Sequence, residues 1–416
     1  MKIAKDILIY LSVEVVSKSI PFLLLPYLTR VLTPSDYAYI TTFTAISSLF
    51  SIIIGFNSQN AISALFYKNH DEIGLYISSS LRLWIGSSIF CILFVSILFF
   101  LSDNYLYIII FPCLFSIFWF PFSLCVTIFR LENSIKFYAI FVITEVAFNV
   151  ILTSALVPLY GAKGRVLSLI LSMLIFFFIS VFIIIRNYNV KINVINIISF
   201  STFYSFTEKD FRILKICTPV LPHLVTGWIR SGLDRYIVSY FFGMMLLGMY
   251  GVAGQLAMVI GVFSNAVTLA IGPFVQRKLS GGYSKQKLVI LTYLTSISLI
   301  FISILYIAFC DYFGEYILGE QYHDSLNILP YFVFSLCFQG ISNLFIVYVY
   351  YSENTKLLFK FAFPCGIVFI AIQIICAKYF SFDVFKWLLV WQSIIYLALV
   401  FYISNKSFKM PWTKFI

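Results

Sequence analysis

The segment SGLDRYIVSYFFG, residues 231–243, places an acid and a guanidinium, Asp234 and Arg235, next to each other within an apolar run. Arg230 stands four residues before Asp234, so these two side chains share one face of a helix and can neutralise each other. Arg235 lies about 100° around the helix from that face. A guanidinium keeps its charge in such a setting and binds the oxygens of a phosphate in bidentate fashion.

Two further arginines, Arg30 and Arg82, stand in apolar runs with no acid at helical spacing. An ionisable group near the bilayer centre costs at least ~3 kcal/mol on insertion scales, so it normally faces protein or water. Arg30, Arg82 and Arg235 are therefore predicted to bind an anionic substrate. Two alternatives stay open: the side chains snorkel to the interface, or they pair with an acid on another helix.

The other charges in apolar runs are of two kinds. Glu14 and Lys18 stand four residues apart, as do Arg230 and Asp234, and both pairs are predicted to be structural or gating charges. Glu145 has no partner at helical spacing, and His223 follows a proline in a broken run. Both are candidates for ion coupling, with a hydrogen-bonded structural role as the alternative.

A polar cluster, GFNSQN at residues 55–60, interrupts the second apolar run. Asn57, Gln59 and Asn60 carry amides, which both donate and accept hydrogen bonds and so bind sugar hydroxyls well. These amides are predicted to contact the substrate. The other interpretation is that they hold neighbouring helices together.

The elements that position these side chains must lie in lipid. Of the 416 residues, 61% are hydrophobic and 11% are charged, and the mean hydropathy is +0.98. This composition excludes a soluble fold, because so few polar residues cannot cover a water-facing surface. Long apolar runs also exclude a transmembrane β-barrel, whose strands alternate and are about 10 residues long.

A spanning helix needs about 20 predominantly apolar residues. Runs of this kind predict an all-α polytopic membrane protein with twelve spans, at 7–31, 37–67, 75–101, 105–129, 137–158, 165–186, 211–240, 244–276, 285–310, 325–352, 357–380 and 384–404. Most Lys and Arg residues lie at the termini and in the even-numbered loops, which predicts that both termini are cytoplasmic. This topology explains the net charge of +11 without nucleic-acid binding.

A polar break divides the spans into two sets of six. We expect an N-terminal six-helix bundle at 1–190, a cytoplasmic linker at 191–210 and a C-terminal six-helix bundle at 211–416. Prolines interrupt the first span of each half, at Pro21 and Pro26 and at Pro219 and Pro222. A kinked helix frees a carbonyl that protein or cavity water must satisfy, so both spans are predicted to border a cavity.

No motif for a cofactor, a metal or a nucleotide accompanies these charges. The sequence contains neither G-x-x-x-x-G-K-[ST] nor H-E-x-x-H, and its eight cysteines show no C-x-x-C spacing. Neither a cofactor nor a metal is therefore implied.

Two long segments carry a family resemblance. The first is PYLTRVLTPSDYAYITTFTAISSLFSIIIGFNSQNAI, which has Ala38 where glycine is expected. The second is LDRYIVSYFFGMMLLGMYGVAGQLAMVIGVFSNAVTLAIGPF, with an Asp-Arg pattern at Asp234 and Arg235 and a Gly-x-Tyr pattern at Gly248 and Tyr250. The chain thus resembles the O-antigen and polysaccharide flippases (Wzx type) of the multidrug/oligosaccharidyl-lipid/polysaccharide (MOP) exporter superfamily.

The resemblance implies a MATE-like fold that flips undecaprenyl-diphosphate-linked oligosaccharide repeat units to the outer leaflet of the bacterial inner membrane by alternating access. It implies no enzymatic activity, and its partners would be membrane lipids and the polymerase and chain-length regulator of the same pathway. Two alternatives stay open, a cation-coupled multidrug exporter of the same superfamily and a polysaccharide polymerase enzyme. The longest predicted outer loop, residues 311–324, leaves little room for the active site of a polymerase.

Overall fold

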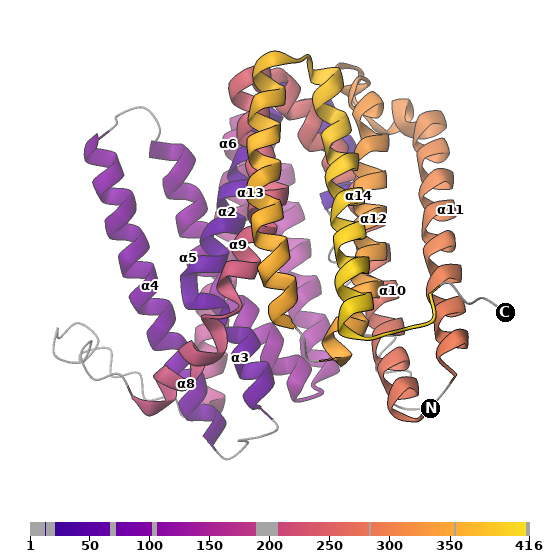
Figure 1. Ribbon diagram of the computed structural model, residues 1–416. Helices are drawn as coiled ribbons and strands as arrows, with labels where there is room; N and C mark the ends of the chain where they lie inside the picture. The colour runs from indigo at the N-terminus through magenta and orange to yellow at the C-terminus, as the bar shows by residue number, and fades with distance from the viewer. Residues whose placement is uncertain are drawn as a thin grey trace. The chain divides into compact units, whose positions relative to one another are not determined.

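The computed structural model describes Val13 and residues 21–66, 72–101, 106–188, 207–282, 284–352 and 355–412 (Figure 1). All regular structure in these residues is helical, and eight helices are long and apolar enough to cross a membrane. The prediction of an all-helical polytopic membrane protein is confirmed for the described part of the chain.

A helical segment at residues 21–31 precedes the elements that follow in chain order. These are α2 (Pro34–Ile53), the 3-10 turn η1 (Ile54–Asn57), α3 (Ser58–Leu65), α4 (Ile73–Leu101), α5 (Leu106–Leu131), α6 (Ile135–Tyr188), α8 (Glu208–Cys217), α9 (Leu221–Phe242), α10 (Met244–Ser280), α11 (Lys285–Ile317), η3 (Glu320–Tyr322), α12 (Ser325–Tyr351), α13 (Thr355–Tyr379) and α14 (Phe382–Ser407).

The chain forms two compact units whose boundaries fall inside helices. Unit 1 contains Tyr39–Gly232, and unit 2 contains Lys18–Ala38 and Leu233–Ile416, so that α2 and α9 each contribute to both. The predicted halves, 1–190 and 211–416, differ from these units at residues 18–38 and 211–232. The difference has a physical cause: α8 packs on α3 and α4, whereas segment 21–38 bonds to α10 and to the loop before α12.

Unit 1 is built around α4, α5 and α6 (Figure 1). α6 is a helical hairpin, because the chain reverses at Gly161 and the hydroxyls of Thr153 and Ser168 meet across its two arms at 3.0 Å. Buried serines, among them Ser80 and Ser87, let α4 approach the η1 turn closely. The predicted spans 137–158 and 165–186 are the two arms of this hairpin.

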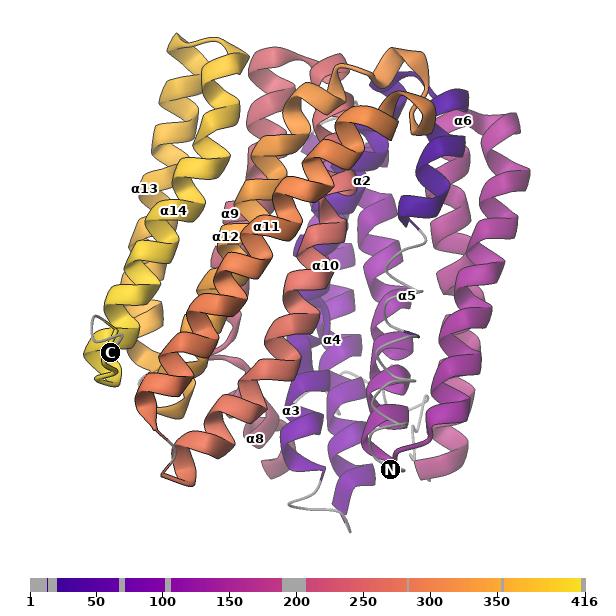
Figure 2. The same ribbon diagram turned by 90° about the vertical axis from the view of Figure 1, so that its right-hand side faces the viewer.

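Unit 2 is centred on α12, which packs against α10, α11 and α14, while α13 packs on α14 (Figure 2). Its core includes Ile237 and Val238 of α9, Tyr250 of α10 and Phe385 of α14. α9 and α10 are joined through Gly243 alone, whose φ of 89° favours glycine. A short link of this kind fixes the start of α10 beside the end of α9.

Two predicted spans are each divided in the structure. Span 37–67 breaks at η1, where three residues in a row leave the helical conformation. Span 211–240 becomes α8 and α9, because the chain turns at residues 218–220 and Pro222 falls in the first turn of α9, where proline is tolerated. Runs of apolar residues predicted the helical regions. Pro219 and Pro222 had predicted an interruption of span 211–240, whereas the left-handed turn at η1 was not predicted.

Candidate functional site

The η1 turn is a strained break in the second predicted span. Gly55, Phe56 and Asn57 all have positive φ values, of 74°, 52° and 55°. Left-handed backbone costs free energy in residues with a side chain, and such strain concentrates at functional sites. The break is held from outside, since Ser87 Oγ accepts the Gly55 N–H at 2.8 Å and a Cβ on Gly55 would lie 2.1 Å from the ring of Phe120.

The three predicted amides do not face one site. Gln59 is 7% exposed, and its Nε2 donates to Asn57 Oδ1 at 2.8 Å. Gln59 Oε1 is buried and accepts no hydrogen bond from the described residues. The structure therefore joins Asn57 and Gln59 at the break, whereas Asn60 is exposed.

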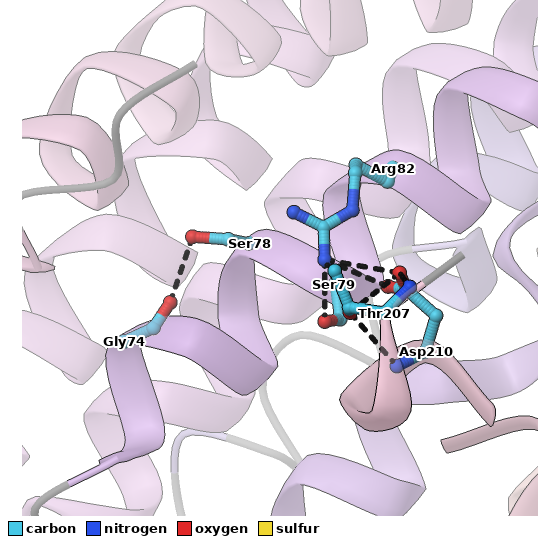
Figure 3. A network of polar contacts seen from close by, with 6 residues as sticks. All are labelled: Gly74, Ser78, Ser79, Arg82, Thr207 and Asp210. Carbon is cyan, nitrogen blue, oxygen red and sulfur yellow. Dashed lines mark hydrogen bonds and ion pairs between the residues drawn. The ribbon is translucent and has the colours of Figure 1, made fainter. Parts of the chain in front are cut away.

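Arg82 of α4 is the centre of a polar network that reaches α8 (Figure 3). Its Nη2 donates to Ser79 Oγ at 2.9 Å, to Thr207 Oγ1 at 3.0 Å and to both oxygens of Asp210, at 2.9 and 3.1 Å. The Arg82 side chain is 43% exposed, whereas that of Asp210 is 3% exposed. Of the two alternatives, pairing with an acid on another helix is the one observed.

Asp210 also completes the first turn of α8. Thr207 and Asp210 form a capping box, in which Thr207 N donates to Asp210 Oδ2 at 2.7 Å. Burial alone would raise the pKa of Asp210, but hydrogen bonds from Thr207, Arg82 and Ser79 outweigh burial and hold that pKa below its usual value. Asp210 is therefore a buried carboxylate that stays charged. Asp210 was not among the residues predicted from the sequence, although TEKD at 207–210 has capping-box spacing.

A second polar network lies inside the α6 hairpin. Glu145 is 8% exposed and accepts a hydrogen bond from Ser172 Oγ at 3.1 Å. On the opposite arm, Arg165 is 7% exposed, and its Nη1 donates to Asn149 Oδ1 at 2.8 Å and to Thr153 Oγ1 at 2.6 Å. Arg165 was not among the predicted site residues, although it begins the predicted span 165–186. Glu145, Asn149 and Thr153 recur every four residues, and this spacing was the available signal.

Arg30 lies in unit 2, at the end of the first helical segment. Its Nη2 donates to the backbone carbonyl of Tyr316 at 2.9 Å, and the side chain is otherwise exposed. The adjacent Thr29 Oγ1 accepts from Gly319 N at 3.1 Å, and Tyr322 OH donates to Leu32 O at 3.0 Å. Arg30 therefore belongs to a clamp between residues 29–32 and the segment that joins α11 to α12.

Asp234 and Arg235 lie in unit 2 on α9. Asp234 is buried and accepts hydrogen bonds from the hydroxyl of Tyr250 and from the backbone N–H of Arg235. Arg235 is half-buried and interacts electrostatically with Asp234. The side chains of Arg230 and His223, together with Glu14 and Lys18, lie outside the described part of the structure.

Both residues of the Gly-x-Tyr pattern of α10, Gly248 and Tyr250, have structural roles. Tyr250 caps the buried carboxylate of Asp234, whereas Gly248 permits a close approach of two backbones. A Cβ on Gly248 would lie 1.8 Å from the carbonyl oxygen of Pro34. Nearby, Tyr37 donates its hydroxyl hydrogen to Gln255 and packs edge-on against Tyr322, with ring centroids 6.0 Å apart.

Comparison with known proteins identifies relatives and a shared fold. Residues 3–278 match the family described as polysaccharide biosynthesis protein. The Lsg locus putative protein 1 of Haemophilus influenzae is 28% identical over 280 residues, which are 66% of this chain and 66% of that protein. The aligned region therefore spans about two thirds of this relative.

Two solved structures have a similar fold. Lipid II flippase MurJ in an inward closed conformation gives a TM-score of 0.68 at 17% identity, over 95% of this chain and 87% of MurJ. An inward-facing multidrug resistance MATE family transporter of the MOP superfamily gives a TM-score of 0.55 at 13% identity, over 94% of each chain. At these identities the likeness establishes the fold, and it confirms the expectation of a MATE-like fold.

Proposed function

Because the chain belongs to the polysaccharide biosynthesis protein family, we propose that it flips polyprenyl-diphosphate-linked oligosaccharide repeat units across the membrane. The repeat unit would be that of O-antigen or a related surface polysaccharide, carried on undecaprenyl diphosphate. Movement would run from the cytoplasmic to the outer leaflet by alternating access of the two predicted six-helix halves. The membrane would be the bacterial inner membrane, with both termini in the cytoplasm.

The observation that carries this proposal is the placement of arginines with exposed guanidinium groups in otherwise apolar helical regions. Arg82 in unit 1 is 43% exposed, and Arg30 in unit 2 is exposed. A neutral or cationic cargo gives no reason to keep such groups, because each costs free energy in a membrane. A diphosphate cargo does give a reason, since a guanidinium binds phosphate oxygens through two parallel hydrogen bonds. Asn57 and Gln59 would contact the sugars.

The other predicted charges have supporting roles in this proposal. Asp234 holds α9 through Tyr250, and Arg235 beside it would attract the diphosphate. Glu14, Lys18 and Arg230 stay predicted structural or gating charges.

Glu145 and His223 stay predicted ion-coupling groups. The polymerase and the chain-length regulator of the pathway stay predicted partners.

Deletion of the gene in its host tests the proposed step directly. Surface polysaccharide and the lipid-linked repeat units of each leaflet would be quantified. We expect loss of surface polymer with complete repeat units accumulating in the inner leaflet. Single repeat units displayed on the outer leaflet would indicate a polymerase instead, and unchanged polymer would lead to drug-efflux assays for the multidrug exporter alternative.

The role of the arginines is tested with single substitutions in a complemented deletion strain. Arg30→Ala and Arg235→Ala are expected to lower surface polymer at normal protein level, because each removes a diphosphate contact. Arg277→Ala is the matched control, since Arg277 is an exposed cation in the last turn of α10. Normal polymer in both variants would refute a diphosphate-binding role for these two residues.

A further inference from the structure

Arg82 binds its partners with one edge of the guanidinium only. All four of its hydrogen bonds to described residues come from Nη2, and the dashed lines that reach Arg82 in Figure 3 meet at that nitrogen. Nε and Nη1 point away from the network (Figure 3) and donate to no described residue. Because the side chain is 43% exposed, a second edge of this group is open to a ligand.

The bound edge is held by groups that are themselves fixed. Asp210 is buried, and its Oδ2 also accepts from Thr207 Oγ1 at 2.7 Å and from Thr207 N at 2.7 Å. Ser79, which accepts from Arg82 one turn away on α4, is fully buried. A long, flexible side chain is therefore ordered before any ligand arrives, which lowers the entropic cost of binding.

Two further cations contact α4 at the seam between α4 and α8. Lys209 and Arg212 flank Asp210 in sequence, and both lie over the ring of Tyr76 on α4, at 5.1 and 5.7 Å. Arg212 Nη1 also donates to Tyr76 OH at 2.7 Å, and Lys209 pairs with Glu72 at 2.5 Å.

We propose that the open edge of Arg82 binds a phosphate group carried by a lipid, and that Asp210 is the positioning residue for this contact. Nε and Nη1 supply donors of fixed orientation, as phosphate oxygens require. Two lipids offer this chemistry, the diphosphate-linked substrate and an anionic phospholipid headgroup. The inference rests on the proposed function only for the first of these. It places a phosphate contact at the α4–α8 seam, which the family match does not assign.

Residue-level chemical protection tests the contact in the unaltered protein. The purified chain in nanodiscs of phosphatidylcholine is treated with phenylglyoxal, which modifies accessible guanidinium groups, and each arginine is followed by mass spectrometry. Inorganic pyrophosphate is the probe for the substrate, and added phosphatidylglycerol is the probe for the headgroup. We expect at least one of them to protect Arg82 while Arg277 stays reactive. Equal reactivity of Arg82 under all three conditions would overturn the proposal.

The two probes distinguish the two sources. Protection by pyrophosphate in phosphatidylcholine supports the substrate diphosphate, and protection by phosphatidylglycerol alone supports the headgroup. Loss of surface polymer in an Arg82→Gln strain, with no protection by either probe, would leave the proposed flippase intact and refute this site. Protection with normal polymer in the deletion strain would refute the flippase and leave the phosphate contact standing.

Variants test the positioning role of Asp210. Arg82→Gln should weaken binding of the protecting probe about tenfold or more, because a charge-assisted contact is lost. Arg212→Gln is the matched control on the same seam and should change binding by less than about threefold. A general electrostatic effect would tighten binding in Asp210→Asn, since an acid is removed, whereas loss of positioning weakens it. Tighter binding in Asp210→Asn would overturn the positioning role.

Arg82→Lys separates geometry from charge. It keeps the cation beside Asp210 but removes the planar fork, so we expect weaker binding with an unchanged melting temperature. Wild-type affinity in Arg82→Lys would refute bidentate recognition by the guanidinium.

Discussion

Substitution of Gly248 by alanine tests whether the close approach of two backbones in unit 2 is required for stability. The new Cβ would lie 1.8 Å from the carbonyl oxygen of Pro34 and 2.6 Å from its carbon. Ordinary contact begins at 3.4 Å, so the two backbones must separate by about 1.6 Å. Neither atom belongs to a flexible side chain that can rotate away.

The magnitude follows from two opposing effects. Overpacking typically costs about 1–3 kcal/mol, and the upper end applies where a backbone must move. Alanine gains about 1 kcal/mol over glycine in a helix interior. The net loss for Gly248→Ala is therefore about 2 kcal/mol. Gly261→Ala on the same helix is the matched control, because its Cβ would meet only side-chain atoms of Leu336 and Met258, at 3.6 Å or more. That variant should keep the gain of about 1 kcal/mol.

The measurement is the apparent melting temperature of both variants in detergent, followed by fluorescence-detected size-exclusion chromatography. A difference of about 3 kcal/mol between them corresponds to about 6–12 °C for a folding unit of some 200 residues. We expect Gly248→Ala to melt below wild type and Gly261→Ala at or above it. Equal melting temperatures for the two variants would show that the 1.8 Å approach does not constrain the folded chain.

Three further predictions concern the polar networks of unit 1. The folded pKa of Asp210 lies below the unfolded value of about 3.9, so its contribution to stability is complete above that value and is lost as pH falls through the folded pKa. Wild type should therefore have a higher melting temperature than Asp210→Asn at pH 7, and the difference in melting temperature should shrink in acid. A difference that does not change with pH would contradict this. Arg165→Met should lower stability by about 1–3 kcal/mol, because buried oxygens of the α6 hairpin lose their donor, whereas Lys163→Met, at an exposed position, should not. Thr207→Ala should cost about 1 kcal/mol and increase proteolysis within α8, and unchanged cleavage would argue against the capping box.

The helical regions were predictable because lipid imposes a simple rule on sequence. A segment that spans the bilayer must be apolar over about 20 residues, so α4, α5, α12 and α14 follow from the apolar runs. The break at η1 was not predictable in the same way. Phe56 and Asn57 adopt left-handed backbone because Ser87 and Phe120 on other helices hold the turn. Hydropathy is evaluated over neighbouring residues only, so it carries no information about contacts between residues distant in sequence.

Candidate residues were easier to select than to interpret. The rule that buried charges have partners identified Arg82, Asp234 and Glu145 as residues worth following. Their partners were a matter of tertiary structure: Asp210 lies 128 residues from Arg82 in sequence. Arg165 was missed because it stands at the first position of the predicted span 165–186, where a cation is ordinary, and only the hairpin geometry of α6 shows that it is buried.

The capping box has a mechanical consequence for the chain between α6 and α9. A helix of 10 residues, such as α8, is too short to be stable in isolation, so α8 keeps its form through its docking on α3 and α4. In helical form these residues span about 15 Å, whereas extended they reach about 33 Å. Unfolding of α8 would therefore lengthen the chain between α6 and α9 by about 18 Å. The contacts of the Asp210 carboxylate with Arg82 and Thr207 help to hold α8 in its shorter, helical form.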